Sequence, residues 1–417
     1  MERIEGQVTD QEELAKQVLS WITCAKRPLT TAELQHALGV EVGEPELDEN
    51  NLPQIEDMVS VCAGLVTVDQ ESGIIRLVHY TTQEYFLRTW KQWFPDAATS
   101  ITDICVTYLS FSAFANGSCL EDVEFEARLR SNQLYDYAAH NWGHHAREAA
   151  RAVPSQVVID FLNSESKVEA QIQALMAARR PEYLGYSQEF PSQMTGLHLA
   201  AYFGIQEVTE HFISTSDNEL DLRDSKDRTP LSYAAGNGHD AIVTLLMATG
   251  QVDVVSPFMY AVQNGHEAVV ALLLATGQVD VNSDDTPGGW TPLGHAAENG
   301  HEAIVALLLA TGQVDVNLKD WLGWSPLSHA AQYGYEAIVT LLLATGQVDV
   351  NSKDRWGETP LSYAAKEGYE TVVKLLLATG QVDVDLKDRG GKTPLSYAVE
   401  GGHEAVVLLL QCYGCTL

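Results

Sequence analysis

The feature that most constrains the fold of this chain is a segment that recurs seven times at a nearly constant spacing. Four of the six steps between successive copies are 34 residues long, and the other two are 27 and 35 residues. A fixed period of this size predicts stacked repeats, because one such unit cannot bury its apolar faces alone. The copies begin at Thr195, Thr229, Ser256, Thr291, Ser325, Thr359 and Thr393.

Each copy predicts two helices and an extended segment, which we call the finger. In one copy, Ser325 is suited to cap the first helix, and Gly334 is suited to the left-handed residue that ends it. The second helix, Glu336–Ala344, is apolar on nearly every side, so other parts of the protein must cover it. Val348–Val350 then alternates with period two, as an extended segment does.

This order of TPLxxAAxxGH, an apolar helix and a finger resembles the ankyrin repeat over residues 195–417. The resemblance implies an α-solenoid of paired helices with short β-hairpin fingers. Only the first copy has the family's His after TPL, as His198, whereas the other six carry Ser, Met or Gly there. The copy from Ser256 has lost about seven residues of its finger, so we expect a gap in the stack there.

The first 95 residues predict a winged-helix domain. The pattern indicates helices at Asp10–Cys24, from Thr31 and at Leu52–Cys62, and strands at Leu65–Val68 and Ile74–Val78. The third helix offers Gln54, Glu56 and Asp57 but no Lys or Arg. Because phosphate contacts need basic side chains, we exclude DNA reading by this helix.

Two further segments carry a second resemblance. LVHYTTQEYF, Leu77–Phe86, resembles the winged-helix domain of fungal NACHT–ankyrin receptors, and YDYAAHNWGHHAR, Tyr135–Arg147, resembles their helical connector. The resemblance implies a mostly α-helical chain with a winged-helix domain at 1–95, a helical connector at 96–190 and seven ankyrin repeats, the third shortened, at 191–417.

In that family, a His at the place of His79 helps to hold bound ADP. No GxxxxGK[ST] loop precedes residue 79, and the nearest match, Gly391–Thr393, lies in a finger and lacks the first Gly. Without a phosphate-binding loop there is no nucleotide to sense, so we interpret His79 as structural and expect no cofactor.

The charge is strongly acidic throughout. The formal net charge is −32, of which −17 falls on residues 195–417 and −15 on the first 194. Nucleic acid and anionic membrane are therefore poor partners. The first ten residues lack the apolar core of a secretion signal, and no apolar run approaches the ~20 residues that span a bilayer. With six cysteines in a chain of this size, we expect a reducing compartment, the cytoplasm or the nucleus or both.

We predict no enzymatic activity, because the chain has no nucleophile elbow, no HExxH and no phosphate loop. We likewise expect no small-molecule substrate. His140, His144 and His145 suggest a metal site, but no partner completes it, and core or surface histidines are the favoured interpretation. Cys412 and Cys415 form a lone CxxC, for which a metal or redox role is the less favoured alternative.

Comparison of the copies with one another separates packing positions from variable ones. The motif ATGQVDV and the Ala-Ala pair are nearly invariant, whereas the finger tips and the two residues after Ala-Ala vary. In ankyrin proteins the matching places line the groove and the fingers that bind partners. The candidate partner-binding residues are Arg228, Trp290, Trp321, Leu322, Trp324, Gln332, Tyr333, Arg355, Trp356, Glu358, Lys366, Arg389 and Lys392.

Four tryptophans at the tips, Trp290, Trp321, Trp324 and Trp356, favour exposed anchors for a partner, since Trp is enriched in binding hot spots. The alternative is that each ring folds back onto a neighbouring finger. Trp324 aligns with Arg228, Glu358 and Lys392, which favours exposure.

We therefore predict a non-enzymatic scaffold or regulator that holds another protein on its concave groove and finger tips. One alternative is a nuclear transcription coregulator that docks on a transcription factor. Another is a truncated or split receptor module that acts with a separate NACHT ATPase. Co-purification with a sequence-specific activator favours the first alternative, and recovery with an ATPase favours the second.

Overall fold

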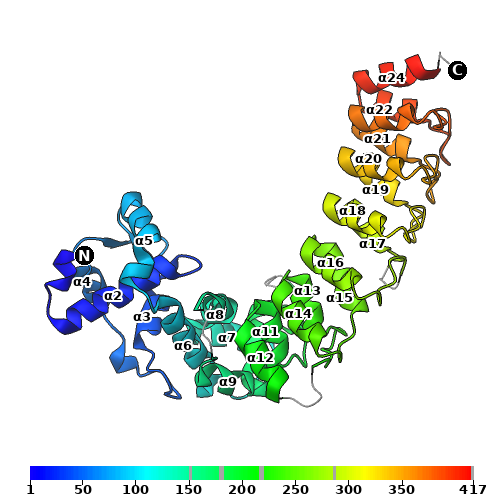
Figure 1. Ribbon diagram of the computed structural model, residues 1–417. Coiled ribbons are helices and arrows are strands. Elements are labelled where there is room, and N and C mark those ends of the chain that lie inside the picture. The colour runs from blue at the N-terminus through cyan, green and yellow to red at the C-terminus, as the bar shows by residue number, and fades with distance from the viewer. Residues whose placement is uncertain (150–152, 178–182, 216–219, 285–287, 415–417) are drawn as a thin grey trace. The chain divides into compact units, whose positions relative to one another are not determined.

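The computed structural model describes residues 1–149, 153–177, 183–215, 220–284 and 288–414, and these are mostly helical. They form two compact units. Unit 1 contains residues 1–234 and 244–252, and unit 2 contains residues 235–243 and 253–417. The division therefore falls in the second repeat, just before the copy with the shortened finger. Figure 1 shows the elements of both units in chain order.

Unit 1 begins with the expected winged-helix domain. Its sheet has the order β1-β3-β2 and is antiparallel, with Leu29 opposite Ile75 and Val66 opposite Leu77. The two wing strands agree with the sequence, while the two-residue strand β1 was not expected. The elements are α1 (Glu2–Glu5), α2 (Thr9–Cys24), β1 (Leu29–Thr30), α3 (Thr31–Gly39), η1 (Glu49–Asn51), α4 (Ile55–Val61), β2 (Val66–Val68), β3 (Ile74–Leu77) and α5 (Tyr80–Trp93).

The helices that follow pack around buried aromatic residues. Helix α6 lies against α8, and Trp142 of α8 is fully buried. Its indole packs edge-on against Phe161, at 5.8 Å between ring centroids, and against Phe203 of the first repeat, at 5.3 Å. The elements are α6 (Ala97–Leu109), η2 (Ser112–Phe114), α7 (Asp122–Ser131), α8 (Tyr135–Ala149), α9 (Gln156–Leu162), α10 (Glu165–Met176) and η3 (Tyr186–Gln188).

Each of the seven copies forms a pair of helices. In unit 2, the first helices of successive pairs lie side by side, and so do the second helices (Figure 1). The pairs are α11 (Gly196–Phe203) with α12 (Gln206–Thr215), α13 (Pro230–Gly236) with α14 (Asp240–Ala248), α15 (Val255–Asn264) with α16 (Glu267–Leu274), α17 (Pro292–Glu298) with α18 (Glu302–Ala310), α19 (Pro326–Gln332) with α20 (Glu336–Ala344), α21 (Pro360–Glu367) with α22 (Glu370–Ala378), and α23 (Pro394–Glu400) with α24 (Glu404–Gly414).

The repeated residues perform the same local functions in each pair. The Ser325 hydroxyl caps α19 by accepting a hydrogen bond from the backbone N–H of Ser328 at 3.2 Å. The Ala-Ala pair of that helix, Ala330 and Ala331, is fully buried. Gly334 then adopts φ +72°, the left-handed conformation expected after the helix. The capping and small-residue positions of the sequence therefore determine where each helix begins, packs and ends.

The ring of the following repeat fills the space under each of these glycines. A Cβ added to Gly334 would lie 2.7 Å from the ring of Tyr369, and one added to Gly300 would lie 2.9 Å from the ring of Tyr335. Because real Cβ atoms do not approach so closely, glycine is required there for contact as well as for conformation. This contact fixes the distance between neighbouring pairs.

His198 takes a neutral, doubly hydrogen-bonded form. Its Nδ1 accepts from the backbone N–H of Thr195 at 3.0 Å, and its Nε2 lies 3.2 Å from the carbonyl of Arg228, to which it donates. Burial lowers the pKa of this imidazole to about 4. In the second copy Ser232 accepts the equivalent N–H, from Thr229 at 3.3 Å, but its short side chain cannot also contact the next finger.

The fingers are tight turns, with no β-strand among the described residues of the repeats. In one finger, the backbone N–H of Asp354 donates to the carbonyl of Glu358 at 3.0 Å. The Asp354 carboxylate accepts from the N–H groups of Trp356 and Glu358, both at 2.8 Å. The carboxylate therefore takes donors that a hairpin ladder would use, so residues 354–358 close as a turn rather than as a ladder.

Two glycines of one repeat provide a matched test of this packing. Gly334→Ala places a Cβ against the Tyr369 ring, whereas Gly346→Ala, at φ +67°, meets nothing within 4 Å. Both substitutions carry the left-handed penalty of roughly 1–2 kcal/mol, and Gly334→Ala adds an overlap cost of roughly 1–3 kcal/mol. Urea unfolding should show the larger loss for Gly334→Ala, and equal losses would contradict the packing described.

The buried His198 should make stability depend on pH. An unfolded imidazole titrates near 6.5, well above the folded pKa of about 4, so the unfolded chain binds more protons between these values. The free energy of unfolding should therefore fall as the pH falls from 7 to 4, by at most about 1.4 kcal/mol per pH unit from this residue. His198→Ser should reduce that slope in urea titrations. An unchanged slope would show that His198 is not kept neutral.

Candidate protein-binding surface

The tips of three successive fingers form one continuous row in unit 2. The backbone N–H of Arg355 donates to the carbonyl of Leu322 at 3.0 Å, and that of Arg389 donates to the carbonyl of Trp356 at 2.8 Å. The same backbone hydrogen bond thus recurs between successive turns and holds each turn against the next one. We call this row, residues 319–324, 353–358 and 387–392, the finger edge.

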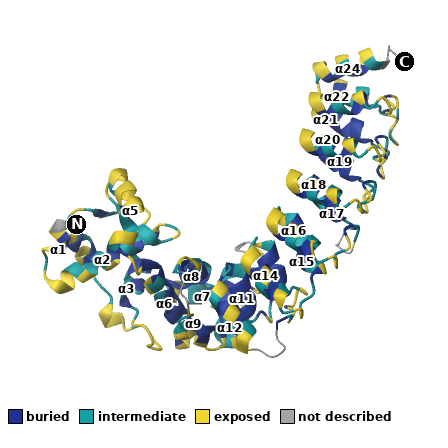
Figure 2. Ribbon diagram, viewed as in Figure 1, coloured by how far each residue is buried: buried dark blue, intermediate teal, exposed yellow. Residues whose placement is uncertain are grey.

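Large side chains on the finger edge face solvent. Trp321 is 63% exposed, Leu322 is 46% exposed and Trp356 is 51% exposed, and the guanidinium residues Arg355 and Arg389 are also exposed. Figure 2 shows exposed segments along these fingers beside the buried first helices. The exposure expected for the tryptophans is therefore found at two of the four positions.

Trp290 and Trp324 are only half-exposed, because each packs on a ring of the next repeat. The Trp290 ring lies 4.5 Å from that of His329, and the Trp324 ring lies 4.3 Å from that of Tyr363, between centroids. His329 also contacts Trp324, at 4.9 Å. The alternative raised by the sequence, in which the indole folds back onto a neighbour, applies to these two residues. Trp321 stays mostly exposed, although one edge of its ring lies against Gly289 of the preceding finger.

The alignment of Trp324 with charged residues does not indicate exposure, because the position lies over an aromatic ring in other repeats too. The Arg228 guanidinium lies 4.6 Å from the centroid of Tyr233, and the Lys392 ammonium lies 5.2 Å from that of Tyr397. A ring face accepts an indole by stacking and a cation by cation–π attraction. Unlike side chains can therefore fill one packing position.

In the three fingers of the finger edge, an aspartate holds the ring beneath the turn. His329 is buried, and its Nε2 lies 3.1 Å from the Asp320 carboxylate. The hydroxyls of Tyr363 and Tyr397 donate in the same way to Asp354 and Asp388. These aspartates are not among the candidates predicted from the sequence, although the Lys-Asp pair shared by three fingers, at 319–320, 353–354 and 387–388, was a usable signal.

The Asp320 carboxylate stays ionised in this setting. Burial alone would raise its pKa, but the hydrogen bonds from His329 and from the backbone N–H of Trp324 outweigh it and lower the pKa. The carboxylate is therefore committed to the turn and to the ring. It is not available as a general base for chemistry at the tips.

The remaining candidates lie at the ends of the first helices or outside unit 2. Tyr333 is 47% exposed, Lys366 is exposed, and Gln332 donates to Glu367 at 3.2 Å. Arg228 belongs to unit 1, where it forms an ion pair with Asp224 at 3.0 Å. The structure thus brings together the candidates of residues 319–392, and Arg228 is not one of that group.

Comparison with known families agrees with the helix pairs. Residues 172–257, 197–285, 258–354 and 346–417 match the family described as Ankyrin repeats (3 copies). The chain belongs to the ankyrin-repeat family. Residues 1–93 match a second family, described as the GPI inositol-deacylase, winged helix domain. The expected combination of a winged-helix domain and ankyrin repeats is confirmed, and ankyrin repeats indicate a role in protein–protein interaction.

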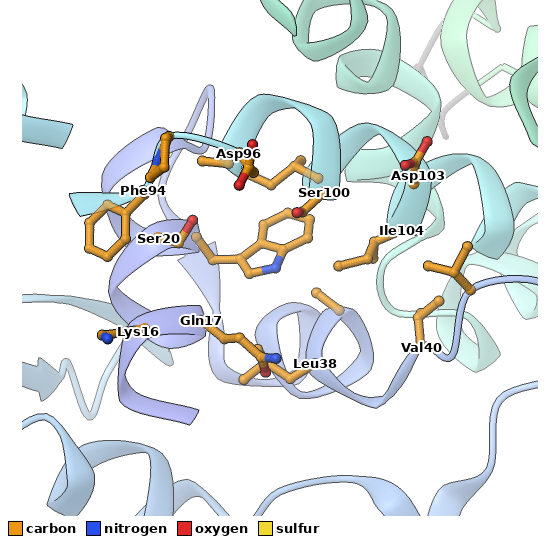
Figure 3. A pocket seen from close by; sticks show the side chains of 16 residues that line it. Lys16, Gln17, Ser20, Leu38, Val40, Phe94, Asp96, Ser100, Asp103 and Ile104 are labelled. Atoms are coloured by element: carbon orange, nitrogen blue, oxygen red, sulfur yellow. The ribbon is translucent and has the colours of Figure 1, made fainter. Parts of the chain in front are cut away.

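A separate cleft of about 490 Å³ lies ahead of the ankyrin repeats, between α2, α3 and α6 (Figure 3). Asp96 and Asp103 lie on its rim, seven residues apart at α6, which is about 10 Å along a helix. Its lining contains no His or Cys. Carboxylates so far apart, without a nearby base, do not form an acid–base pair.

The histidines singled out by the sequence have structural partners. His79 caps α5 by accepting from the N–H of Thr81 at 3.2 Å. His145 is buried, with its Nε2 2.8 Å from the Tyr137 hydroxyl, and burial lowers its pKa to about 3. His140 lies 3.2 Å from the Asp136 carboxylate.

The described part of the chain contains neither a cluster of metal-binding side chains nor a membrane-spanning helix. No group of three His, Cys, Asp or Glu residues there is placed to hold a metal ion. Within the same residues, no helix is both long enough and apolar enough to span a membrane. Cys412 is exposed, and Cys415, the other half of the CxxC, lies outside the described residues.

The two kinds of tryptophan should respond differently to truncation. Trp324→Ala removes a half-buried indole from between His329 and Tyr363, which should lower the free energy of unfolding by about 1–3 kcal/mol. Trp321→Ala removes an exposed ring and should change it by less than about 0.5 kcal/mol. Chemical denaturation measures both, and a large loss for Trp321→Ala would place that ring in the fold.

Proposed function

We propose that this protein is a non-enzymatic scaffold or regulator that binds a partner protein along the finger edge and the exposed ends of the first helices. The observation that supports this most strongly is the pair of exposed indoles, Trp321 and Trp356, on turns that hydrogen bonds hold in a fixed row. Residues of this type in a preorganised surface lose little conformational entropy on binding.

The contact surface would combine apolar anchors with charged neighbours. Trp321, Leu322 and Trp356 would supply the desolvated centre, and Tyr333 would extend it onto α19. The polar rim would consist of Gln332, Arg355, Glu358, Lys366, Arg389 and Lys392, while Trp290 and Trp324 would support it from beneath.

The proposal includes no catalytic step and no cofactor, because the polar groups beneath the tips are committed to structure. Asp354 accepts from two backbone N–H groups and from the Tyr363 hydroxyl, and Asp388 is bonded in the same way to Tyr397. The proposed partner is a transcription factor, a NACHT ATPase or a signalling protein. We propose that the two proteins bind each other in the cytoplasm or the nucleus.

A second candidate is a receptor module that acts with a separate ATPase, as the resemblance of Leu77–Phe86 to the winged-helix domain of NACHT–ankyrin receptors implies. The observation that favours it is an exposed apolar strip where β3 meets α5: Val78 is 56% exposed, Tyr80 67% and Leu87 58%. This strip borders an open cleft of about 730 Å³. A partner recovered through these residues, and not through the finger edge, would favour this candidate.

The double variant Trp321→Ala/Trp356→Ala tests the main proposal. Each hot-spot tryptophan is worth ~2 kcal/mol, so each truncation should weaken partner binding by about 30-fold without lowering the thermal melt. The measurement is quantitative mass spectrometry of proteins that the full chain captures from an extract of cells that express it.

Thr340→Ala, an exposed change on the second helix α20, is the matched control and should capture the same proteins as the unmodified chain. Equal capture by the double variant and by the control would overturn the proposed surface.

A further inference from the structure

Five basic side chains on the finger edge make no ion pair with a carboxylate of the described residues. Lys319, Lys353, Arg355, Lys387 and Arg389 are all exposed. Two other cations of the same unit are paired: Lys392 lies 2.7 Å from Glu400, and Lys374 pairs with Glu370. In a chain with 57 acidic and 25 basic residues, a row of unpaired cations on one edge is unexpected.

The acidic residues of the finger edge make no ion pair with these five cations, and the Glu358 carboxylate accepts a hydrogen bond from the Tyr397 hydroxyl at 2.6 Å. Asp354 is 8% exposed and directs its carboxylate at the backbone of its own turn and at Tyr363. Asp320 is bonded to His329 in the same way. The finger edge therefore presents these five cations outward and keeps the Asp320 and Asp354 carboxylates inward, which gives an acidic protein a row of exposed cations.

Two lysines of the row, Lys319 and Lys353, are held in place by hydrogen bonds. The Lys319 ammonium donates to the carbonyl of Lys353 at 2.9 Å, and the Lys353 ammonium donates to the carbonyl of Lys387 at 3.1 Å. An ammonium has three N–H donors, so each keeps donors for an incoming oxygen. Because the cations are already ordered, an anionic ligand would bind them at a reduced entropic cost.

We propose that the finger edge binds an extended acidic segment of a partner protein that carries apolar side chains between its carboxylates. The inference rests on the proposed function and specifies the chemistry of the partner. Carboxylates would pair with Arg355, Arg389 and the lysines, and the apolar side chains would cover Trp321 and Trp356. Charge-assisted hydrogen bonds from arginine to carboxylate would fix the orientation of the bound segment, and the indoles would bury its apolar side chains.

The distance between neighbouring repeats determines how far apart the acidic residues of that segment should lie. Packed helices lie about 8–10 Å apart, and a ligand in the extended polyproline II conformation rises about 3.1 Å per residue with about three residues per turn, so every third side chain faces the same way. One repeat therefore matches about three residues of ligand, so acidic residues should recur about every third position. Three fingers correspond to a segment of about seven to nine residues.

The charge around the row disfavours a long polyanion. Residues 229–318 contain nine acidic residues and no lysine or arginine. A nucleic acid that follows the fingers would leave the cations after a short distance and meet acidic repeats, where phosphate is repelled. A short acidic segment can stay within the basic part, which favours a peptide over nucleic acid.

Selection from a random-peptide display library against the full chain tests the inference. The recovered peptides should be enriched in Asp and Glu at a period of about three, with Leu or aromatic residues between them. Synthetic copies should bind at least tenfold more weakly at 300 mM than at 50 mM NaCl, because screening weakens exposed ion pairs. Arg355→Glu/Arg389→Glu should abolish their binding, while Lys374→Ala, on the second helix α22, should leave it unchanged.

The outcomes separate this inference from the proposed function. Peptides without acidic enrichment that still depend on Trp321 and Trp356 would overturn the inference and leave the proposed surface intact. Peptides that bind independently of both tryptophans and both arginines would overturn both. A 20-nucleotide single strand that binds through Arg355 and Arg389 more tightly than any recovered peptide would overturn the acidic-peptide assignment in favour of nucleic acid.

Discussion

The contact between a glycine of one repeat and the ring that follows it in the next is the interaction on which the ankyrin stack depends. The ring of Tyr369 lies against Gly334, and His403 lies against Gly368, so neither glycine can carry a side chain. The His403 Nε2 also donates to the carbonyl of Lys366, at 3.0 Å, near the end of the preceding helix. This bond and the close packing of the ring on the glycine together set the spacing of the repeats. Every regular feature of unit 2, including the row of finger tips, follows from that spacing.

A stack with fixed spacing separates stability from recognition. The Ala-Ala pairs and the second-helix residues Val339 and Leu342 are fully buried and serve packing, whereas Trp321 and Trp356 contact solvent at positions that differ from repeat to repeat. The finger turns are independent of those tip residues, since Asp354 closes its turn through backbone N–H groups. A tip can therefore change from Trp to Arg without a change in the fold. This arrangement lets an acidic chain place a few indoles and cations on one edge.

Much of this architecture could be predicted from the sequence, because the signals are local. The caps at Ser325 and Thr359, the glycines and the wing strands are all determined by residues close in the chain. Strand β1 was missed because two residues give no period, and it exists only through its pairing with β3. The exposure of Trp324 was misjudged for a different reason: comparing copies shows which side chains a position tolerates but not that an aromatic ring lies beneath it. The unpaired state of Arg355 and Arg389 also depends on side-chain geometry that no sequence pattern displays.

The central claim is that the regular stack exists to present its finger edge to a partner. Amide hydrogen exchange of the full chain, with and without a bound peptide from the display selection, tests this directly. The account predicts slower exchange in residues 319–324, 353–358 and 387–392, and unchanged exchange in the second helices α18, α20 and α22. Protection confined to those second helices, or to residues 1–93, would contradict it.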